Sequence, residues 1–241
     1  MLEVHFLTLF PEAVESYLTS SILGRAQKAG LLQVHLLDFR RFATDKHQQV
    51  DDRPYGGGPG MVLKPEPIFS AVEWVEETYG VCRKILMTPS GTPFRQNTAT
   101  EFAQEERLLL LCGRYEGFDE RIRKGIDWTE ISLGDFVLCG GELGALAVVE
   151  ASARLIPNVL GHDQSAVFES FTDPLLLDHP HYTRPEVFRD MVVPEVLTSG
   201  NHAKVDRWRQ AQARLRTGER RPDLQSHQIT DKHQTSRDND G

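Results

Sequence analysis

Short apolar runs alternate with segments of helical spacing through about the first 160 residues of the 241-residue chain. Short apolar runs are typical of strands, and apolar residues three and four positions apart are typical of helices. Their alternation predicts an α/β domain around a mostly parallel sheet, which we assign to residues 1–160. We expect strands at 4–9, 32–37, 84–87, 108–112 and 130–133, and helices at 11–28, 67–79, 96–104, 118–124 and 142–156.

The pattern changes after residue 160. Residues 161–183 show no clear period and are expected to form a linker or functional loop. Helical spacing returns at 185–191 and at 203–216, where Gly218 is expected to end the helix. Residues 184–225 are therefore predicted to form a small helical domain, and the polar residues 226–241 to be disordered.

Charge is unevenly distributed along the chain. The net charge of −8 disfavours a protein that coats nucleic acid without selectivity. The segment RWRQAQARLRTGERR (207–221) nevertheless carries six arginines and one acid, Glu219. Two interpretations remain open from this pattern: a solvated helix face, or a surface for an anionic partner such as RNA phosphates.

The cysteines and the N-terminal residues indicate the cellular compartment in which the protein is expected. Cys112 and Cys139 end apolar runs, and Cys82 makes the number of cysteines odd. We expect buried free thiols in a reducing cytoplasm, with neither disulfides nor a metal site. MLEVHFLTLFPE has no basic leader, so no signal peptide is expected. The longest apolar runs are too short to cross a bilayer, which argues against a membrane protein.

The most densely punctuated stretch is DDRPYGGGPGM (51–61), with four glycines and two prolines. It is not a Walker loop, because no Lys-Ser or Lys-Thr follows, and GxGxxG fails at Met61. Prolines restrict the chain while glycines permit positive φ, a combination suited to a fixed loop that approaches a ligand closely. A simple surface turn is the alternative, and the pattern alone favours it.

Three further glycine-bearing turns follow predicted strands: TPSG (88–91), GRYEG (113–117) and LGDFVLCGGE (133–142). Ligands of open α/β sheets bind at the carboxyl ends of the strands. Each turn alone is weak evidence, but together they predict one pocket. His179 and His181 resemble a metal motif, yet the intervening Pro180 and the lack of clustered ligands favour a hydrogen-bonding role.

These turns carry a family resemblance. DDRPYGGGPGM, CGRYEGFDER, SLGDFVLCGGE, PNVLGH, PHYTRPEV and LTSGNHAKVDRWR occur in this order over nearly the whole chain. Together they closely resemble the bacterial tRNA (guanine-N1)-methyltransferases of the TrmD type, in the SPOUT family. The resemblance implies a deep trefoil knot in the C-terminal part of the α/β domain, although general topology rules argue against knots.

The resemblance also implies an activity. Members act as homodimers on guanosine 37 of tRNA, next to the anticodon, with S-adenosylmethionine as methyl donor and assistance from Mg²⁺. The sequence itself shows no carboxylate cage for such an ion. By matching motifs, the donor site would comprise Pro89, Gly113, Glu116, Leu133, Gly134, Asp135, Phe136, Val137, Leu138, Gly140 and Gly141. The tRNA would be held by Asp51, Arg53, Gly58, Gly60, Arg114, His181 and Asn201.

The chemistry sets its own requirements. N1 of guanine carries a proton, and removing it sends negative charge to O6. A general base must therefore lie near N1 and a cation or donor near O6. The family's catalytic arginine falls on Arg154, and its linker aspartate falls on Glu169. Glutamate has a similar intrinsic pKa but is one methylene longer, so Asp163 and Asp173 remain weaker alternatives.

Two departures from the family leave rival functions open. Glu169 replaces the aspartate, and Gly144 stands where many relatives carry proline, which loosens the helix start but removes no chemical group. The nearest rival is a related SPOUT methyltransferase with another RNA target. The rival from a different class is a catalytically inactive RNA-binding protein.

Overall fold

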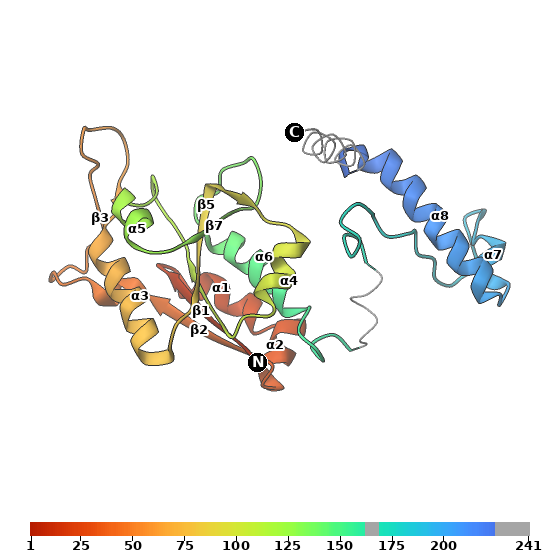
Figure 1. The fold of residues 1–241 in the computed structure, drawn as a ribbon, viewed down its shortest axis with the longest axis horizontal. Helices are drawn as coiled ribbons and strands as arrows, with labels where there is room; N and C mark the ends of the chain where they lie inside the picture. Colours follow the sequence, from red (N-terminus) through yellow and green to blue (C-terminus); the bar gives the residue numbers. More distant parts are fainter. Residues whose placement is uncertain (162–168, 225–241) are drawn as a thin grey trace, which may run out of the picture. The chain divides into compact units, whose positions relative to one another are not determined.

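The structure is a computed structural model that describes residues 1–161 and 169–224 (Figure 1). The predictions for Asp163 and for the tail at 226–241 lie outside the described residues. The chain divides into two compact units, Met1–Asp163 and Gln164–Gly241. Each unit is described by itself below.

The first unit is built on a five-stranded sheet in the order β2-β1-β6-β5-β7. All neighbouring strands pair in parallel, which confirms the predicted α/β class with a parallel sheet. β5 is longer than predicted, because it continues through the turn at 88–91 after a register shift between Met87 and Thr92. The strands are β1 (Leu2–Thr8), β2 (Leu32–Asp38), β5 (Arg83–Pro93), β6 (Arg107–Leu111) and β7 (Thr129–Ser132).

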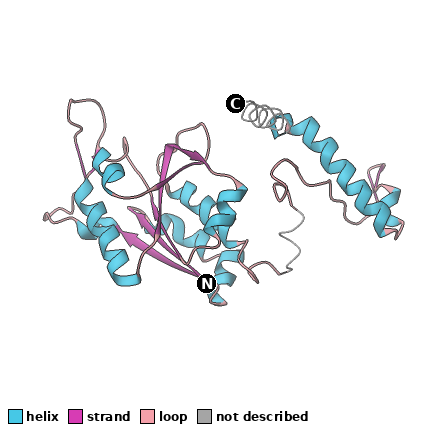
Figure 2. Ribbon diagram, viewed as in Figure 1, coloured by secondary structure: helices cyan, strands magenta, loops and turns pink. Residues whose placement is uncertain are grey.

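Helices cover both faces of this sheet (Figure 2). One apolar cluster joins β1 residues Val4 and Phe6 to α1 (Pro11–Leu18), α2 (Ser21–Lys28), α4 (Gln96–Phe102) and α6 (Glu142–Ala153). The other joins Leu7 of β1 to the 3₁₀ helix η1 (Phe39–Phe42), α3 (Pro65–Tyr79) and α5 (Glu120–Gly125). The strand interior is thus buried on both sides, as parallel sheets require.

The prediction of one helix over 11–28 was wrong. α1 ends at Leu18, and Ser20 has extended dihedral angles before α2 begins. Ser21 then adopts a positive φ of 46°. A Cβ atom at Gly24 would lie 2.1 Å from the carbonyl oxygen of Thr19, so the glycine lets α2 pack closely against the end of α1.

The described part of the second unit includes a short antiparallel hairpin and the helices α7 and α8. The hairpin pairs β8 (Val187–Phe188) with β9 (Met191–Val192), so the predicted helix at 185–191 was wrong. Its turn residues Arg189 and Asp190 have φ of 49° and 61°, a backbone that a helix excludes. The helices are α7 (Glu195–Thr198) and α8 (His202–Arg220), and α8 runs through Gly218, where it was expected to end.

Candidate functional site

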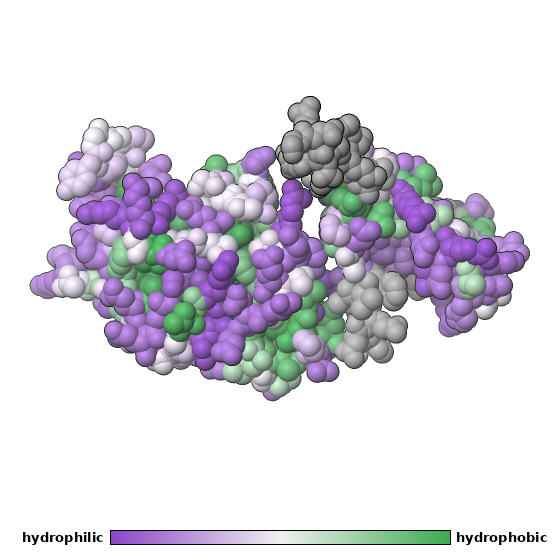
Figure 3. All heavy atoms as spheres, in the orientation of Figure 1, coloured by the Kyte–Doolittle hydropathy of each residue, from purple (hydrophilic) through white to green (hydrophobic). Residues whose placement is uncertain are grey.

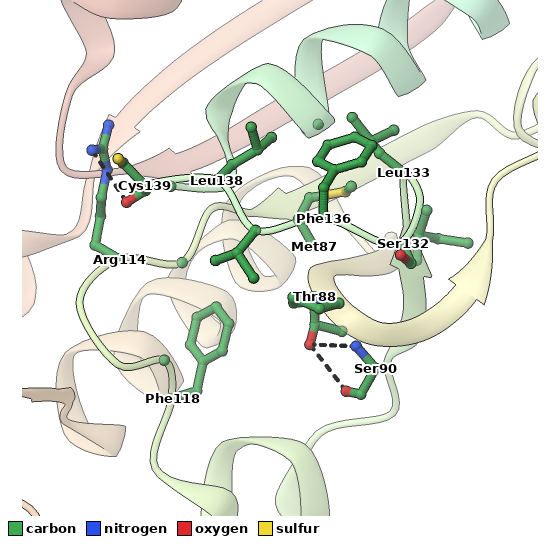
Figure 4. A pocket seen from close by; sticks show the side chains of 18 of the residues that line it. Met87, Thr88, Ser90, Arg114, Phe118, Ser132, Leu133, Phe136, Leu138 and Cys139 are labelled. Carbon is green, nitrogen blue, oxygen red and sulfur yellow. Dashed lines mark hydrogen bonds between the residues drawn. The ribbon is translucent and has the colours of Figure 1, made fainter.

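A cavity of about 410 Å³ lies at the carboxyl ends of β6 and β7 and beside the irregular part of β5 that begins at Met87 (Figure 4). Its volume is within the range of small-molecule sites, and its position is where open α/β sheets bind ligands. Residues from all three glycine-bearing turns line it. Of the eleven predicted donor residues, only Asp135 is outside the lining, and its side chain is exposed.

Backbone contact fixes two of these turns against each other. The amide of Gly141 donates to the carbonyl oxygen of Gly113 at 3.0 Å. A Cβ atom at Gly141 would lie 2.8 Å from Cα of Cys112 and 2.9 Å from the nitrogen of Gly113. Neither backbone atom can move aside as a flexible side chain can, so this position requires glycine. The cavity floor is therefore set by backbone packing.

A buried carboxylate holds Arg114 at one side of the cavity. The Arg114 guanidinium lies 3.0 Å from Oε2 of Glu142, and its Nη1 donates to the carbonyl oxygen of Cys139 at 3.4 Å (Figure 4). Thr8 donates to Oε1 of Glu142 at 2.7 Å, and Arg114 also lies over the ring of Phe10. Because Glu142 is buried and doubly bonded, the guanidinium is held in one place.

A second arginine, Arg123 of α5, also lines the cavity. Its Nη2 donates to Oγ1 of Thr88 at 2.7 Å, and Thr88 lies 3.0 Å from Oγ of Ser90. Arg123 also forms an ion pair with Glu130 at 3.6 Å. No local pattern in the sequence indicates that an arginine of α5 reaches Thr88 of β5, so Arg123 was not among the predicted site residues.

The segment after β7 forms an apolar wall. Phe136, Val137 and Leu138 line the cavity, yet each is also exposed, with Val137 at 84%. Cys139 is exposed as well, which corrects the prediction that all three thiols are buried. The run FVLC is a loop and not a strand, so its last residue does not enter the core. Cys112 is fully buried, and burial raises the pKa of its thiol.

The glycine-rich stretch forms a loop between β3 (Asp51–Asp52) and β4 (Val62–Leu63). It protrudes from the first unit (Figure 1), and its residues have intermediate hydropathy, white to pale purple in Figure 3. The side chain of Tyr55 is fully exposed. All four glycines of the loop have positive φ. The described chain leaves open space around Gly58, whose φ is 121°. The loop therefore has a defined backbone with an accessible surface.

The base of this loop joins the cavity. The amide of Glu116 donates to the carbonyl oxygen of Met61 at 2.9 Å, and the amide of Leu63 donates to Gly117 at 2.9 Å. A Cβ atom at Gly60 would lie 2.3 Å from Oε1 of Glu116. The loop and the turn at 113–117 are thus one connected structure, and Gly60 lies beside the predicted donor site. Asp51 pairs with Leu63 at the base of the same hairpin, and Arg53 follows β3 and is exposed.

The remaining predicted site residues belong to the second unit, except Arg154, which caps the C-terminal end of α6. Glu169 is half-buried, and its amide donates to Oγ1 of Thr172 at 3.4 Å. The side chain of Asn201 caps α8 by accepting from the amide of Lys204 at 3.1 Å. The structure therefore assigns Asn201 at least a structural role that the sequence analysis had not foreseen.

His181 is exposed and lies 2.7 Å from Oδ2 of Asp178. Burial raises the pKa of Asp178, but hydrogen bonds from His181 and from the amide of His179 outweigh it and lower the pKa overall. The favoured hydrogen-bonding role of the two histidines matches this geometry. Neighbouring Tyr182 lies against Trp208 of α8, with ring centroids 6.3 Å apart.

Within the described parts of the chain, no helix is both long enough and apolar enough to span a bilayer.

The fold and the cavity together define an α/β protein with a parallel sheet and a cavity of small-molecule size beside the ends of its strands. Sequence comparison narrows this class, because the family model for tRNA (Guanine-1)-methyltransferase TrmD matches residues 2–227. The chain belongs to this family.

Three curated relatives illustrate the similarity, and each is described as a tRNA (guanine-N(1)-)-methyltransferase. The protein of Dehalococcoides mccartyi strain 195 is 52% identical over 224 residues, covering 92% of this chain and 90% of the relative. That of Staphylococcus epidermidis strain RP62A is 50% identical, covering 96% and 94%. That of Bacillus licheniformis is 51% identical, covering 92% of each.

Proposed function

We propose that this chain transfers a methyl group from S-adenosylmethionine to N1 of guanosine 37 in tRNA. The observation that carries the proposal is the single cavity formed by the three glycine-bearing turns in a chain of this methyltransferase family. The relatives' names give tRNA and guanine N1, and the donor and the position follow from the motif resemblance.

The cavity's chemistry suits the donor. Phe136, Val137 and Leu138 offer apolar surface for a flat adenine ring, and Gly113 and Gly140 let the ligand approach the backbone. Glu116, the one carboxylate in the described lining, can face a cationic centre. When bound, the donor supplies a methyl group already activated on a sulfonium, so the protein's task is alignment.

Glu169 is proposed as the general base that takes the proton from N1. Arg154 is proposed to stabilise the negative charge that develops on O6, because a guanidinium keeps its charge throughout. Because glutamate is one methylene longer than aspartate, the linker backbone would lie slightly farther from the guanosine when the carboxylate reaches N1. Asp173, whose side chain accepts from the amide of Leu175 at 3.0 Å, is the alternative base within the described residues.

The position of Arg154 supports a homodimer. Gly141 lines the cavity at the start of α6, whereas Arg154 lies at the other end of that helix. At 1.5 Å of rise per residue, the two positions are about 20 Å apart, farther than an arginine side chain reaches. We therefore propose that Arg154 acts at the cavity of a second copy, across an interface that includes exposed apolar residues such as Val137 and Leu143.

A mixing experiment tests this arrangement. Arg154→Ala and Gly141→Val are each expected to be inactive, one for lack of the arginine and the other for lack of the donor cavity. Mixed dimers contain one intact site only if the arginine acts in trans, so co-refolded equal amounts should regain about a quarter of wild-type activity. A mixture as inactive as its components would contradict the shared site.

The knot belongs to the same proposal. The chain leaves β7 at one edge of the sheet, crosses the ends of β5 and β6 through 133–141, and continues into α6, which packs against β1. The hydrogen bond between Gly141 and Gly113 brings this crossing segment against the loop that follows β6. That arrangement supports a trefoil knot of the SPOUT type.

The exposed arginines at 207–216 in α8, namely Arg207, Arg209, Arg214 and Arg216, are proposed to contact tRNA phosphates. His181, Asn201, Asp51 and Arg53 would hold the substrate, and Gly58 and Gly60 would border the guanosine. With tRNA as substrate and free cysteines, the protein is proposed to act in the cytoplasm.

The cavity lining does not supply the ligands that a Mg²⁺ ion needs. Mg²⁺ prefers several oxygen ligands, and the described lining contributes one carboxylate, Glu116. We derive no step through this ion.

One assay tests the function. The protein is incubated with labelled donor and an unmodified tRNA transcript, and the modified nucleotide is mapped. Label on N1 of guanosine 37 is expected, with none when that guanosine is replaced. Label elsewhere would indicate the rival with another RNA target, and donor binding without transfer would indicate an inactive RNA-binding protein.

A further inference from the structure

The carboxyl end of β1 is connected to the cavity through a buried carboxylate. Thr8, the last residue of β1, donates from its hydroxyl to Oε1 of Glu142 at 2.7 Å, and Glu142 pairs with Arg114 of the cavity lining. We propose that Thr8 and Glu142 are positioning residues for tRNA binding, which hold the Arg114 guanidinium where it binds a phosphate of the tRNA. This inference rests on the proposed function and gives a role to two residues that were not among the predicted site residues.

The Thr8 hydroxyl connects the two groups that support Arg114. It accepts from the amide of Phe10 at 3.0 Å while it donates to Glu142. The Phe10 ring lies against the Arg114 guanidinium, with 4.4 Å between the ring centroid and Cζ, which is a cation–π contact. Nε of Arg114 donates to Oε1 of Glu142 at 3.3 Å, and Nη2 lies 3.0 Å from Oε2. A carboxylate therefore holds one edge of the guanidinium, and an aromatic ring supports one face.

The ion pair of Arg114 and Glu142 is also closely packed. A Cβ atom at Gly140 would lie 2.4 Å from Nε of Arg114 and 2.4 Å from Oε2 of Glu142, so the glycine leaves the room that the pair occupies. Thr8 and Glu142 are both buried. A buried carboxylate is costly unless it is paired and hydrogen-bonded, and here Thr8 and Arg114 satisfy it. The guanidinium is thus fixed before any ligand binds.

Arg114 still has N–H groups to offer. A guanidinium carries five of them, and within the described chain those of Arg114 engage only Glu142 and the carbonyl oxygen of Cys139, which lies 3.4 Å from Nη1. The side chain is 25% exposed and stands at one side of the cavity, opposite Ser132 and Leu133 (Figure 4). Two remaining N–H groups match two oxygens of a phosphate. A tRNA whose guanosine meets the donor in this cavity would bring phosphates close to this side.

Net charge alone leads to the opposite expectation. Glu142 is an anion close to a surface that would bind a polyanion, so Glu142→Gln should strengthen tRNA binding if only charge mattered. If Glu142 acts by holding Arg114, the same substitution should weaken tRNA binding, because the guanidinium must then be ordered when the tRNA binds. The direction of the change therefore separates a positioning role from a simple effect of charge.

The test measures two affinities of the full-length protein, one for an unmodified tRNA transcript and one for S-adenosylmethionine. Arg114→Ala should weaken tRNA binding about 10- to 100-fold, and Glu142→Gln and Thr8→Val about 5- to 10-fold. Donor affinity should stay unchanged in the Thr8 and Glu142 variants, because neither residue lines the cavity. In the Arg114→Ala background, Glu142→Gln should weaken tRNA binding no further, since a positioning residue acts only through the residue that it holds.

Two variants serve as controls. Thr8→Ser keeps the hydroxyl and should bind tRNA as the wild type does. Glu150→Gln removes the same charge as Glu142→Gln from an exposed position of α6, and it should not weaken tRNA binding. If Glu142→Gln and Thr8→Val both fail to fold, Arg114→Lys decides, because lysine keeps the charge but cannot pair along an edge with Glu142. It should bind tRNA several-fold more weakly.

Three results would overturn the proposal: tRNA binding as strong as or stronger than wild type in Glu142→Gln or, where that variant does not fold, in Arg114→Lys; the same loss from Glu142→Gln with and without Arg114; or an Arg114→Ala variant that loses donor affinity and not tRNA affinity. In the last case Arg114 would bind the carboxylate of the donor. A wild-type protein that binds no tRNA would contradict the proposed function as well, whereas normal tRNA binding in all of these variants would contradict only this inference.

Discussion

The cavity that we propose for the donor and the surface that we propose for tRNA are built in opposite ways. The cavity is formed by backbone turns in direct contact and by buried pairs such as Arg114 with Glu142. The proposed tRNA surface consists of exposed groups, including the arginines of α8 and the open glycine-rich loop. A preformed site can bind a small ligand of fixed shape, whereas a polyanion is bound through many weak, salt-dependent contacts.

The glycines illustrate the same contrast. Gly141 is required because neighbouring backbone leaves no room for a Cβ atom. Gly58 has ample room in the described chain and is required only by its positive φ. Substitution at Gly141 should therefore affect the cavity itself, and substitution at Gly58 should affect what approaches from outside. The predictions below separate these two kinds of site.

The largest effect is expected at Glu169. Glu169→Gln removes the proposed base but keeps the shape of the side chain, so kcat should fall by about 10²–10⁴. Donor affinity, measured by calorimetry, should remain unchanged, because the cavity is lined by residues of the first unit.

Glu169→Asp is the matched control, and it should retain most activity because the carboxylate persists. Full activity in Glu169→Gln together with a large loss in Asp173→Asn would transfer the role to Asp173.

The next largest effect is expected at Gly141. Gly141→Val forces side-chain atoms against Cys112 and Gly113, which should reduce donor affinity by about 100-fold and cost about 3 kcal/mol of unfolding free energy or more. Calorimetry and denaturant unfolding measure the two effects. Gly161→Ala, at a position with open space, is the control and should leave both unchanged. Normal donor binding by Gly141→Val would show that the two turns can separate.

How far the sequence predicts this site depends on the range of the interactions. The turn at 88–91 in β5 and the turns after β6 and β7 could be predicted to lie together, because apolar runs identify strands and parallel strands end at one edge of the sheet. The pairing of Glu142 with Thr8 joins residues 134 positions apart, and Arg123 reaches Thr88 from another helix. No local pattern encodes such contacts.

The errors in the fold have a similar origin. The hairpin at Val187–Val192 was predicted as helix because its apolar residues also fit helical spacing, and the positive φ of Arg189 and Asp190 has no glycine to signal it. Cys139 was predicted to be buried because it ends the apolar run FVLC. Tertiary context decided both cases, as it often does for short apolar runs.

A smaller effect is expected in the glycine-rich loop. Gly58→Val should reduce methyl transfer about tenfold, because the strained loop can no longer approach the guanosine as proposed. Gly30→Val is the matched control, since Gly30 also has a positive φ and open space but lies after α2. Both substitutions should cost about 1–2 kcal/mol of unfolding free energy. If Gly58→Val and Gly30→Val proved equally active, the loop would be a turn without a role in the reaction.

The smallest effect at physiological salt is expected on α8. Alanine at Arg207, Arg209 and Arg214 together should weaken tRNA binding several-fold, because each exposed arginine contributes one screened contact. The more specific measurement is the salt dependence: if three phosphate contacts are lost, the slope of log affinity against log salt should fall by about two to three.

Substituting Arg25, Lys28 and Arg83 provides a control that removes the same charge from exposed positions of the first unit. It should lower affinity only slightly and leave the slope nearly unchanged. Equal slopes in the two triple variants would mean that net charge attracts the tRNA, and that α8 is only a solvated helix. A smaller slope in the α8 variant alone would show that its arginines contact the phosphates. Binding to this surface would then depend on salt, in contrast to binding in the preformed cavity.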